Sequence, residues 1–294
     1  MQSPQNAKLV GRPATAATKI IHLTPKTSIG GRELLIIGGP CAVEDANQME
    51  IVASTLKAAP VQALRGGIYK PRTSPYSFQG LGDAGLKILT EIRQRYQLPI
   101  VSEVMAIHQI ETLIEHADLL QVGSRNMQNF DLLKALGEIK KPVMLKRGLS
   151  ATLEEFVLAA EYIAAHGNPN IVLCERGIRS FDGYTRNVLD LGGVVALKQL
   201  TTLPIVVDPS HATGKRELVP DLARAAIAAG ADGLMIECHP QPEASVSDAR
   251  QALSLETMTQ LVHSLEPIAA AVGRCLVQPE QADYAGSPVA NTAA

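Results

Sequence analysis

The sequence lacks the features that mark membrane-spanning, exported and nucleic-acid-binding proteins. It has no tryptophan, and no apolar run reaches the roughly 18 residues that a bilayer span requires. The first 19 residues lack the apolar stretch of a secretory signal. The net charge is only −2, and neither a basic face nor a basic amphipathic helix is evident. We therefore expect a soluble protein with no membrane and no nucleic acid among its partners.

Cysteine is also scarce. The 294 residues include four cysteines, and no two of them form a close pair. They are Cys41, Cys174, Cys238 and Cys275. This distribution fits a reducing compartment better than a disulfide framework, so the expected location is the cytoplasm. A hydrophobic content of 46% with 19% charged residues is ordinary for a globular enzyme.

Eight short apolar runs of the buried-strand type recur along the chain, 20 to 36 residues apart. The intervals between them hold helical patterns, which is typical of repeated right-handed β-α-β crossovers and a parallel sheet. This alternation predicts the α/β class and a single (β/α)8 TIM barrel, with an open eight-stranded sheet as the alternative. The runs begin at Leu34, Ala63, Pro99, Leu119, Pro142, Ile171, Pro204 and Gly233.

Two flanks fall outside this pattern. Residues 1–33 are expected to form a loose, polar leader and a short N-terminal β-hairpin extension, with the hairpin over Thr18–Arg32 covering the barrel floor. The barrel itself is expected over 34–276 and a flexible C-terminal tail over 277–294, where little can be buried. Among the helix starts, Thr152 has a glutamate three residues later and predicts a capping box.

Cationic side chains gather where the predicted strands end, which is where barrel enzymes place their chemistry. A lone Lys or Arg there could simply pair with acids on the surface, but five strand ends together argue against that interpretation. Like charges about 4 Å apart repel by about 4 kcal/mol at an effective dielectric of 20, so such a cluster indicates an anionic ligand with several charges. The residues are Arg65, Lys70, Arg72, Arg125, Lys146, Arg147 and Arg176.

A second group has the donor types of a metal site: Cys41, His211, Glu237 and Asp248. Taken singly, the cysteine could be a small buried hydrophobe, the histidine a loop residue and Asp248 a helix cap. The first, seventh and eighth strands are neighbours in a closed barrel, however, so three of the four would lie close together. One thiolate, one imidazole and two carboxylates suit manganese, iron, cobalt or zinc better than magnesium or calcium.

Several stretches of the chain carry a family resemblance. They include GGPCAVE, RGGIYKPRTSPYSFQGLG, QVGSRNMQNFDLLK, VLCERGIRSFDGYTRN, VDPSHATGKRELV and IECHPQPEASVSD. These stretches resemble the 3-deoxy-D-arabino-heptulosonate 7-phosphate (DAHP) synthases of the type I beta group, over roughly Ile36 to Leu253. The resemblance implies a metal-dependent condensation of phosphoenolpyruvate with D-erythrose 4-phosphate and water, the first step of the shikimate pathway to aromatic amino acids.

The resemblance also implies roles for individual residues. Catalytic roles fall on Lys70, on Glu103 as the group that orders a water, and on Cys41 and His211, which with Glu237 and Asp248 are the implied ligands of a divalent metal; manganese is the first choice in vitro. The phosphoenolpyruvate cradle falls on Arg65, Lys70, Ser124, Arg125, Lys146 and Arg176, with Arg147 beside it, and the sugar-phosphate site on Lys70, Pro71, Arg72 and Thr73. Members of the group commonly form homodimers or homotetramers.

Two alternatives remain at this point. The related 3-deoxy-D-manno-octulosonate 8-phosphate synthases use arabinose 5-phosphate, but they typically place Ala-Asn between this lysine and arginine, so Pro71 favours the four-carbon aldehyde. A non-catalytic barrel that binds phosphorylated metabolites is the other alternative, although every ligand and cradle residue is in place. We see no segment long enough for a regulatory domain or a fused chorismate mutase, which predicts no intrinsic feedback inhibition by aromatic amino acids.

Overall fold

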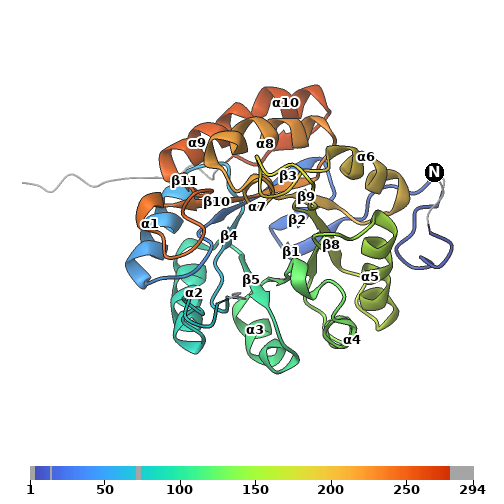
Figure 1. Cartoon of the computed structure of the whole chain (residues 1–294), viewed down its shortest axis with the longest axis horizontal. Coiled ribbons are helices and arrows are strands. Elements are labelled where there is room, and N and C mark those ends of the chain that lie inside the picture. Colours follow the sequence, from blue (N-terminus) through green and yellow to red (C-terminus); the bar gives the residue numbers. More distant parts are fainter. Residues whose placement is uncertain (1–3, 14, 71–73, 279–294) are drawn as a thin grey trace, which may run out of the picture.

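The fold is a closed barrel of parallel strands inside a ring of helices, seen in a computed structural model that describes residues 4–13, 15–70 and 74–278 (Figure 1). Consecutive barrel strands pair in parallel from β3 round to β10, and β10 pairs with β3 to close the barrel. The prediction of a (β/α)8 barrel is therefore confirmed, and the open sheet is excluded. The eight strands are β3 (Glu33–Gly39), β4 (Ala63–Arg65), β5 (Ile100–Val104), β6 (Leu119–Val122), β7 (Val143–Lys146), β8 (Ile171–Glu175), β9 (Ile205–Val207) and β10 (Gly233–His239).

Each barrel strand is followed by at least one helix that packs against the outside of the sheet. The predicted capping box begins α5: the Thr152 hydroxyl accepts a hydrogen bond from the Glu155 amide, and the Glu155 carboxylate accepts one from the Thr152 amide. Phe156 on the next turn is fully buried. The helices are α1 (Ala46–Lys57), α2 (Asp83–Tyr96), α3 (Ile110–His116), α4 (Phe130–Gly137), α5 (Leu153–Ala165), α6 (Leu191–Leu200), α7 (Pro209–Thr213), α8 (Val219–Ala228), α9 (Leu255–Ser264) and α10 (Glu266–Ala271).

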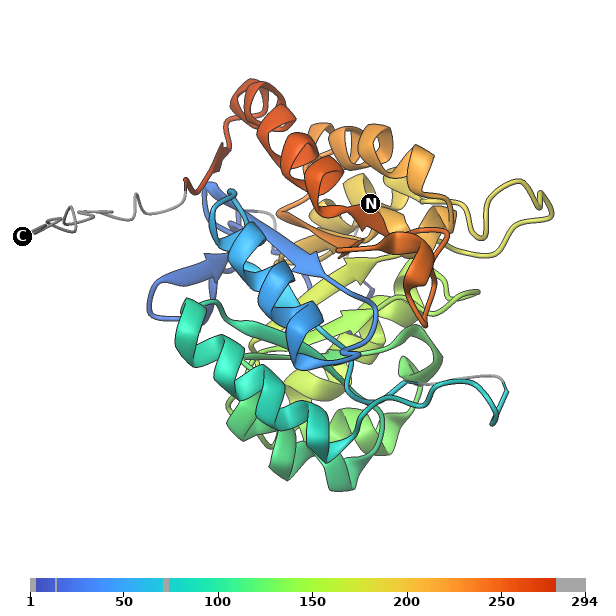
Figure 2. The ribbon, with the colours of Figure 1, turned by 90° about the vertical axis from the view of Figure 1, so that its left-hand side faces the viewer.

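A short antiparallel hairpin closes one end of the barrel, as expected. Its strands are β1 (Ile21–Thr24) and β2 (Thr27–Ile29). Ile21, Leu23 and Ile29 belong to the same buried apolar cluster as the inward-facing barrel residues, among them Met144 and Met235. In Figure 2 the hairpin lies at left, whereas the loop after β8 projects at right, from the opposite end of the barrel. The hairpin thus fills the floor and leaves the carboxyl ends of the strands for the site.

The leader before the hairpin is not loose, so that prediction was wrong. Ala7 and Val10 are buried, and the backbone amides of Lys8, Leu9 and Val10 donate hydrogen bonds to the carboxylate of Glu161 on α5. One carboxylate therefore satisfies a run of backbone donors and allows two small apolar side chains to reach the core. This pairing joins residues about 150 positions apart, which is why local composition did not indicate it.

The last described strands are two short ones that each pair in parallel with a barrel strand, β11 (Leu253–Ser254) with β10 and β12 (Cys275–Leu276) with β3. The expected flexible tail lies outside the described residues except for its first two positions. Within the described ranges, no helix combines the length and the hydropathy that would let it cross a lipid bilayer.

Candidate active site

The four predicted metal ligands meet at the carboxyl end of the barrel. Cys41 follows β3, His211 lies in α7, Glu237 lies in β10, and Asp248 lies in the segment after β10. One donor atom from each, sulfur, nitrogen or carboxylate oxygen, lies within 4.8 Å of all the others. Residues up to 207 positions apart in the sequence therefore surround one point, as the neighbouring barrel strands predicted.

The chemistry of this group fits a divalent cation. Burial lowers the pKa of His211 to about 3, so its imidazole is neutral at pH 7 and free to donate a lone pair. Burial, with the nearby Glu237 carboxylate, raises the pKa of the Cys41 thiol to about 11, and burial raises the pKa of Glu237 to about 7. The buried Oε1 of Glu237 has no hydrogen-bond partner in the described part of the chain. A cation bound among these donors would displace the protons from the Cys41 thiol and the Glu237 carboxyl group.

A strained backbone positions Asp248. Its φ angle of 55° lies in the left-handed region, which few residues other than glycine adopt. Its carboxylate accepts a hydrogen bond from the Cys41 thiol at 3.2 Å and pairs with Arg186 at 3.3 Å. The hydroxyl of Ser247 also donates to the Cys41 sulfur, at 3.2 Å. Strain held in place by such contacts is a feature of functional sites.

A cavity of about 490 Å³ opens beside the metal group, and the predicted cations line it. Arg65, Lys146 and Arg176 are each about 5% exposed or less, so their charges are largely desolvated. Nη1 of Arg176 has no hydrogen-bond partner among the described residues. Arg125, an exposed residue in the short 3-10 helix after β6, completes the rim. A buried guanidinium with an unused donor facing a cavity is suited to a phosphate or carboxylate ligand.

Lys70 lies between the cavity and the metal group. Its ammonium donates to the Cys41 sulfur at 2.9 Å and to the Cys41 carbonyl at 3.0 Å, and it also lines the cavity. Gly67 makes this approach possible, because a Cβ there would lie 2.9 Å from the Cys41 carbonyl oxygen and 3.1 Å from the Lys70 side chain. Lys70 can therefore reach both a bound metal's ligand and a substrate.

Glu103 and Ser124 occupy another wall of the same cavity. The Glu103 carboxylate accepts a hydrogen bond from the Gln121 amide at 3.1 Å. Gly123 faces it so closely that a Cβ at that position would lie 2.2 Å from Glu103 Oε1. The Glu103 carboxylate is thus held by the buried side-chain amide of Gln121 on one side and packs against the backbone of Gly123 on the other. It lies next to the cations that line the cavity.

Asp208 is a site residue to which the sequence did not assign a role. Its carboxylate accepts a hydrogen bond from Lys146 at 2.6 Å and lies 2.8 Å from Nδ1 of His211, and it is fully buried. It begins α7 by capping the His211 amide. Its position directly after an apolar strand, three residues before a candidate ligand, was the available signal. Gln121 and Gln251, which hold Glu103 and Glu237, carried no comparable signal.

The structure does not place Arg147 with the other cations. Its guanidinium pairs with Glu175 at 2.9 Å and with Asp190 at 2.8 Å, and it does not line the cavity. Consecutive residues after a strand point in opposite directions, so Lys146 faces the cavity and Arg147 faces the helices. The predicted sugar-phosphate residues Pro71, Arg72 and Thr73 lie outside the described residues.

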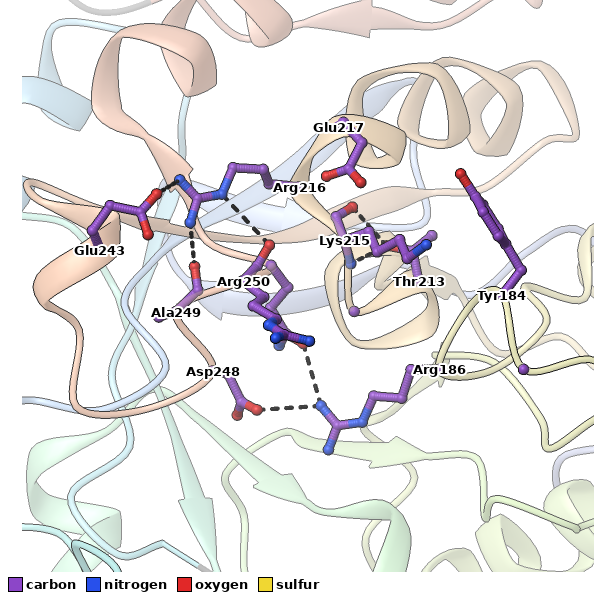
Figure 3. Close-up of a pocket in the computed structure, with 13 residues that line it drawn as sticks. Tyr184, Arg186, Thr213, Lys215, Arg216, Glu217, Glu243, Asp248, Ala249 and Arg250 are labelled. Carbon is purple, nitrogen blue, oxygen red and sulfur yellow. Dashed lines mark hydrogen bonds and ion pairs between the residues drawn. The ribbon is translucent and has the colours of Figure 1, made fainter.

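A second, larger cavity of about 790 Å³ lies on the outer side of the metal group, among the segments that follow β8, α7 and β10 (Figure 3). Arg216 there pairs with Glu243 at 2.7 Å, and Lys215 lies over the ring of Tyr184 at 3.4 Å. Asp248 and Arg186 line both cavities, so their contact forms part of the wall between them.

Comparisons with known proteins identify the family to which the chain is similar. The family model described as the DAHP synthetase I family matches residues 15–271. The chain is 47% identical over 266 residues to a phospho-2-dehydro-3-deoxyheptonate aldolase of Thermotoga maritima, a match that covers 90% of this chain and 78% of that protein. It is 32% identical over 257 residues to a 2-dehydro-3-deoxyphosphooctonate aldolase of Desulfosudis oleivorans, covering 81% of this chain and 91% of that one.

A solved structure matches equally well. The crystal structure of a phospho-2-dehydro-3-deoxyheptonate aldolase (DAHP synthase) from Thermotoga maritima superposes with a TM-score of 0.89 at 46% identity, covering 93% of this chain and 80% of that one. The family match therefore extends to the arrangement of the barrel as well as to its sequence. On the extent of the family model, the identity to a curated relative and this superposition, the chain belongs to the DAHP synthetase I family.

Proposed function

We propose that the chain is a 3-deoxy-7-phosphoheptulonate synthase, which condenses phosphoenolpyruvate with D-erythrose 4-phosphate and water to give 3-deoxy-D-arabino-heptulosonate 7-phosphate and phosphate. The observation that carries the proposal is the adjacency of a four-ligand metal group and a cationic cavity, joined by Lys70. Each substrate is a phosphate ester, and a cavity that holds two anions in contact must supply several cations.

The cavity residues divide between the two substrates. We assign the phosphoenolpyruvate phosphate and carboxylate to Arg65, Lys146 and Arg176, which are buried, and to Ser124 and Arg125 at the rim. The sugar phosphate is assigned to the segment Lys70 to Thr73, of which the structure describes only the lysine. The buried cations bind the substrate that must lie deepest, because their charges gain most from a ligand when water is excluded.

The metal site is assigned to Cys41, His211, Glu237 and Asp248. These four residues would hold a divalent cation, which would supply a Lewis acid for the aldehyde oxygen. The Lys70 ammonium, 2.9 Å from the Cys41 sulfur, donates a proton to that oxygen as the methylene carbon of phosphoenolpyruvate bonds to the aldehyde carbon. Glu103 orients a water toward the adjacent carbon and accepts its proton, and loss of phosphate from the adduct leaves the ketone.

Three finer assignments belong to the same proposal. Manganese is the metal we expect to support activity in vitro, since borderline ions suit a donor set of one sulfur, one nitrogen and two oxygens. The active protein is expected to be a homodimer or homotetramer. The cytoplasm is the expected location, in line with four unpaired cysteines in the described chain.

The test is a product assay on the metal-stripped and the metal-loaded protein. Phosphoenolpyruvate is supplied with erythrose 4-phosphate or with arabinose 5-phosphate, and the product is identified by mass. We expect the seven-carbon product from the manganese-loaded protein only. An eight-carbon product would favour the octulosonate reaction that the 32% identical relatives are named for, and turnover that survives complete chelation would refute the metal assignment.

A further inference from the structure

Gln251 lies between Glu237 and Arg186, a cation that also contacts Asp248 and lines both cavities. It is 2% exposed and lies three residues after Asp248, in the segment between β10 and β11. Its side-chain amide donates a hydrogen bond to Glu237 Oε2 at 2.8 Å. Its side-chain carbonyl accepts one from Arg186 Nη1 at 3.2 Å, and the same guanidinium nitrogen lies 3.3 Å from Asp248 Oδ1.

These contacts act on both carboxylates of the metal group. The side-chain amide of Gln251 donates to Glu237 Oε2, the oxygen that lies 3.4 Å from His211 Nε2, whereas Oε1 has no hydrogen-bond partner among the described residues. Arg186 occupies Oδ1 of Asp248, whereas Oδ2 faces the Cys41 sulfur. Figure 3 shows the contact between Arg186 and Asp248, two of the residues that line the outer cavity. Hydrogen bonds from the chain therefore restrain one oxygen of Glu237 and both oxygens of Asp248, which fixes the orientation of each side chain.

The backbone around Gln251 is also held in place. The backbone amide of Gln251 donates a hydrogen bond to the backbone carbonyl of Asp248 at 3.1 Å. This bond closes a turn that begins at Asp248, the residue with the left-handed φ. Arg216 supports the turn from outside, since it donates to the carbonyls of Ala249 and Arg250. A side chain on so constrained a turn keeps its direction without the help of a bound ion.

We infer that Gln251 is a positioning residue for the metal site, which orients the Glu237 carboxylate and is itself oriented by Arg186. This inference rests on the metal site of the proposed function. Groups that hydrogen-bond to metal ligands fix the orientation of those ligands, and their loss typically costs about 10- to 100-fold in metal affinity. Without the amide, Glu237 would be free to turn toward Arg65, 3.9 Å away, which competes for the same oxygen.

The test uses the full chain, stripped of metal, and the Gln251→Met variant, whose side chain has a similar length but no hydrogen-bonding group. Free Mn²⁺ is titrated and counted by electron paramagnetic resonance, and Co²⁺ spectra report the ligand geometry. We expect Mn²⁺ affinity to fall about 10- to 100-fold and the ligand-field bands of Co²⁺ to shift, while the thiolate-to-Co²⁺ band persists because Cys41 is intact.

The matched control is Gln109→Met. Gln109 is 8% exposed, its carbonyl accepts hydrogen bonds from the amides of Met105 and Ala106, and it lines neither cavity. It should lower thermal stability and leave the Mn²⁺ affinity and the Co²⁺ spectrum unchanged. An equal loss of affinity in both variants would overturn the inference, because the effect would then come from general destabilisation.

A second variant keeps the inference testable if Gln251→Met does not fold. Arg186 is 42% exposed, so Arg186→Met leaves no buried gap, and we expect it to weaken Mn²⁺ binding in the absence of any substrate. Wild-type affinity and spectra in the variants would overturn the inference while the proposed function stands. Failure of the wild-type chain itself to bind Mn²⁺ or Co²⁺ would overturn both.

Discussion

The ammonium of Lys146 and the carboxylate of Asp208 form an ion pair of 2.6 Å in which both side chains are buried. Because the same carboxylate oxygen lies 2.8 Å from Nδ1 of His211, a cation of the substrate cavity and a candidate metal ligand share one acid. Burial lowers the pKa of His211 to about 3, so the imidazole stays neutral; Nδ1 lies beside Asp208, and Nε2 lies 3.4 Å from Glu237 Oε2 in the metal group.

Asp208→Asn should therefore weaken both halves of the site at once. The amide has the same shape but no charge, so Lys146 loses its counter-ion and His211 loses the carboxylate that lies 2.8 Å from its Nδ1. We expect Mn²⁺ affinity to fall about 10-fold or more and the KM for phosphoenolpyruvate to change with it. Mn²⁺ titration and steady-state kinetics check the two effects.

The same substitution at Asp118 provides the control. Asp118 is also buried, and it accepts hydrogen bonds from Arg93 and from the Ile100 amide at the start of β5, at the end of the barrel away from the site. Asp118→Asn should cost stability because it leaves a cation without its charge partner, and it should not alter Mn²⁺ affinity. If both variants bind Mn²⁺ like the wild type, the role given to Asp208 is wrong.

Cys41→Ala is expected to abolish metal retention and turnover together. Cys41 is the sole sulfur donor of the group, and alanine leaves the ion with one imidazole and two carboxylates. Cys174→Ala is the matched change, since Cys174 is an equally buried cysteine that packs inside the barrel. It should retain metal at the cost of about 1 kcal/mol of stability. Metal analysis and activity measurements decide, and near-normal activity of Cys41→Ala in metal-free buffer would refute the prediction.

Much of this site could be predicted from the sequence because barrel topology converts strand ends into neighbours. Cys41, His211 and Glu237 each stand at or just after the end of an apolar run, and β3, β9 and β10 are adjacent in the barrel. The same rule failed for Arg147, since it identifies the end of a strand but not which of two successive side chains faces the cavity.

The features that the sequence did not reveal depend on contacts over long separations. The pairing of Glu161 with the leader spans about 150 residues, and Arg186 and Gln251 meet from two different loops. Neither contact has a local periodicity or a motif of its own. Side-chain amides such as Gln251 are the hardest to recognise, because they acquire a role only from the carboxylate beside them.

The hairpin that fills the barrel floor predicts a large stability effect. Ile29 is fully buried among inward-facing barrel residues, so Ile29→Ala should lower the free energy of unfolding by about 2 to 5 kcal/mol. Ile20, one residue before the hairpin, is 52% exposed. Ile20→Ala should therefore change the free energy of unfolding by less than about 0.5 kcal/mol. Denaturant unfolding measures both. Equal effects would show that the hairpin does not contribute to the core.

Gly123 offers a test of Glu103 that leaves the charge of the site unchanged. A Cβ at position 123 would lie 2.2 Å from Glu103 Oε1 and 3.0 Å from its carboxyl carbon, so Gly123→Ala must displace the carboxylate. The displaced group is the end of a flexible side chain, which can move without disturbing the barrel. The variant should therefore fold with nearly the thermal stability of the wild type.

Catalysis should respond quite differently from stability. If Glu103 orients the attacking water and accepts its proton, moving it should lower kcat by about 10²- to 10⁴-fold, while Mn²⁺ affinity stays at the wild-type value because Glu103 is not a ligand. Gly183→Ala is the control, since no atom lies within 4 Å of a Cβ at that position, and it should keep its full kcat. A Gly123→Ala variant with normal kcat would mean that the position of Glu103 does not matter to the reaction, and the water would then need another base.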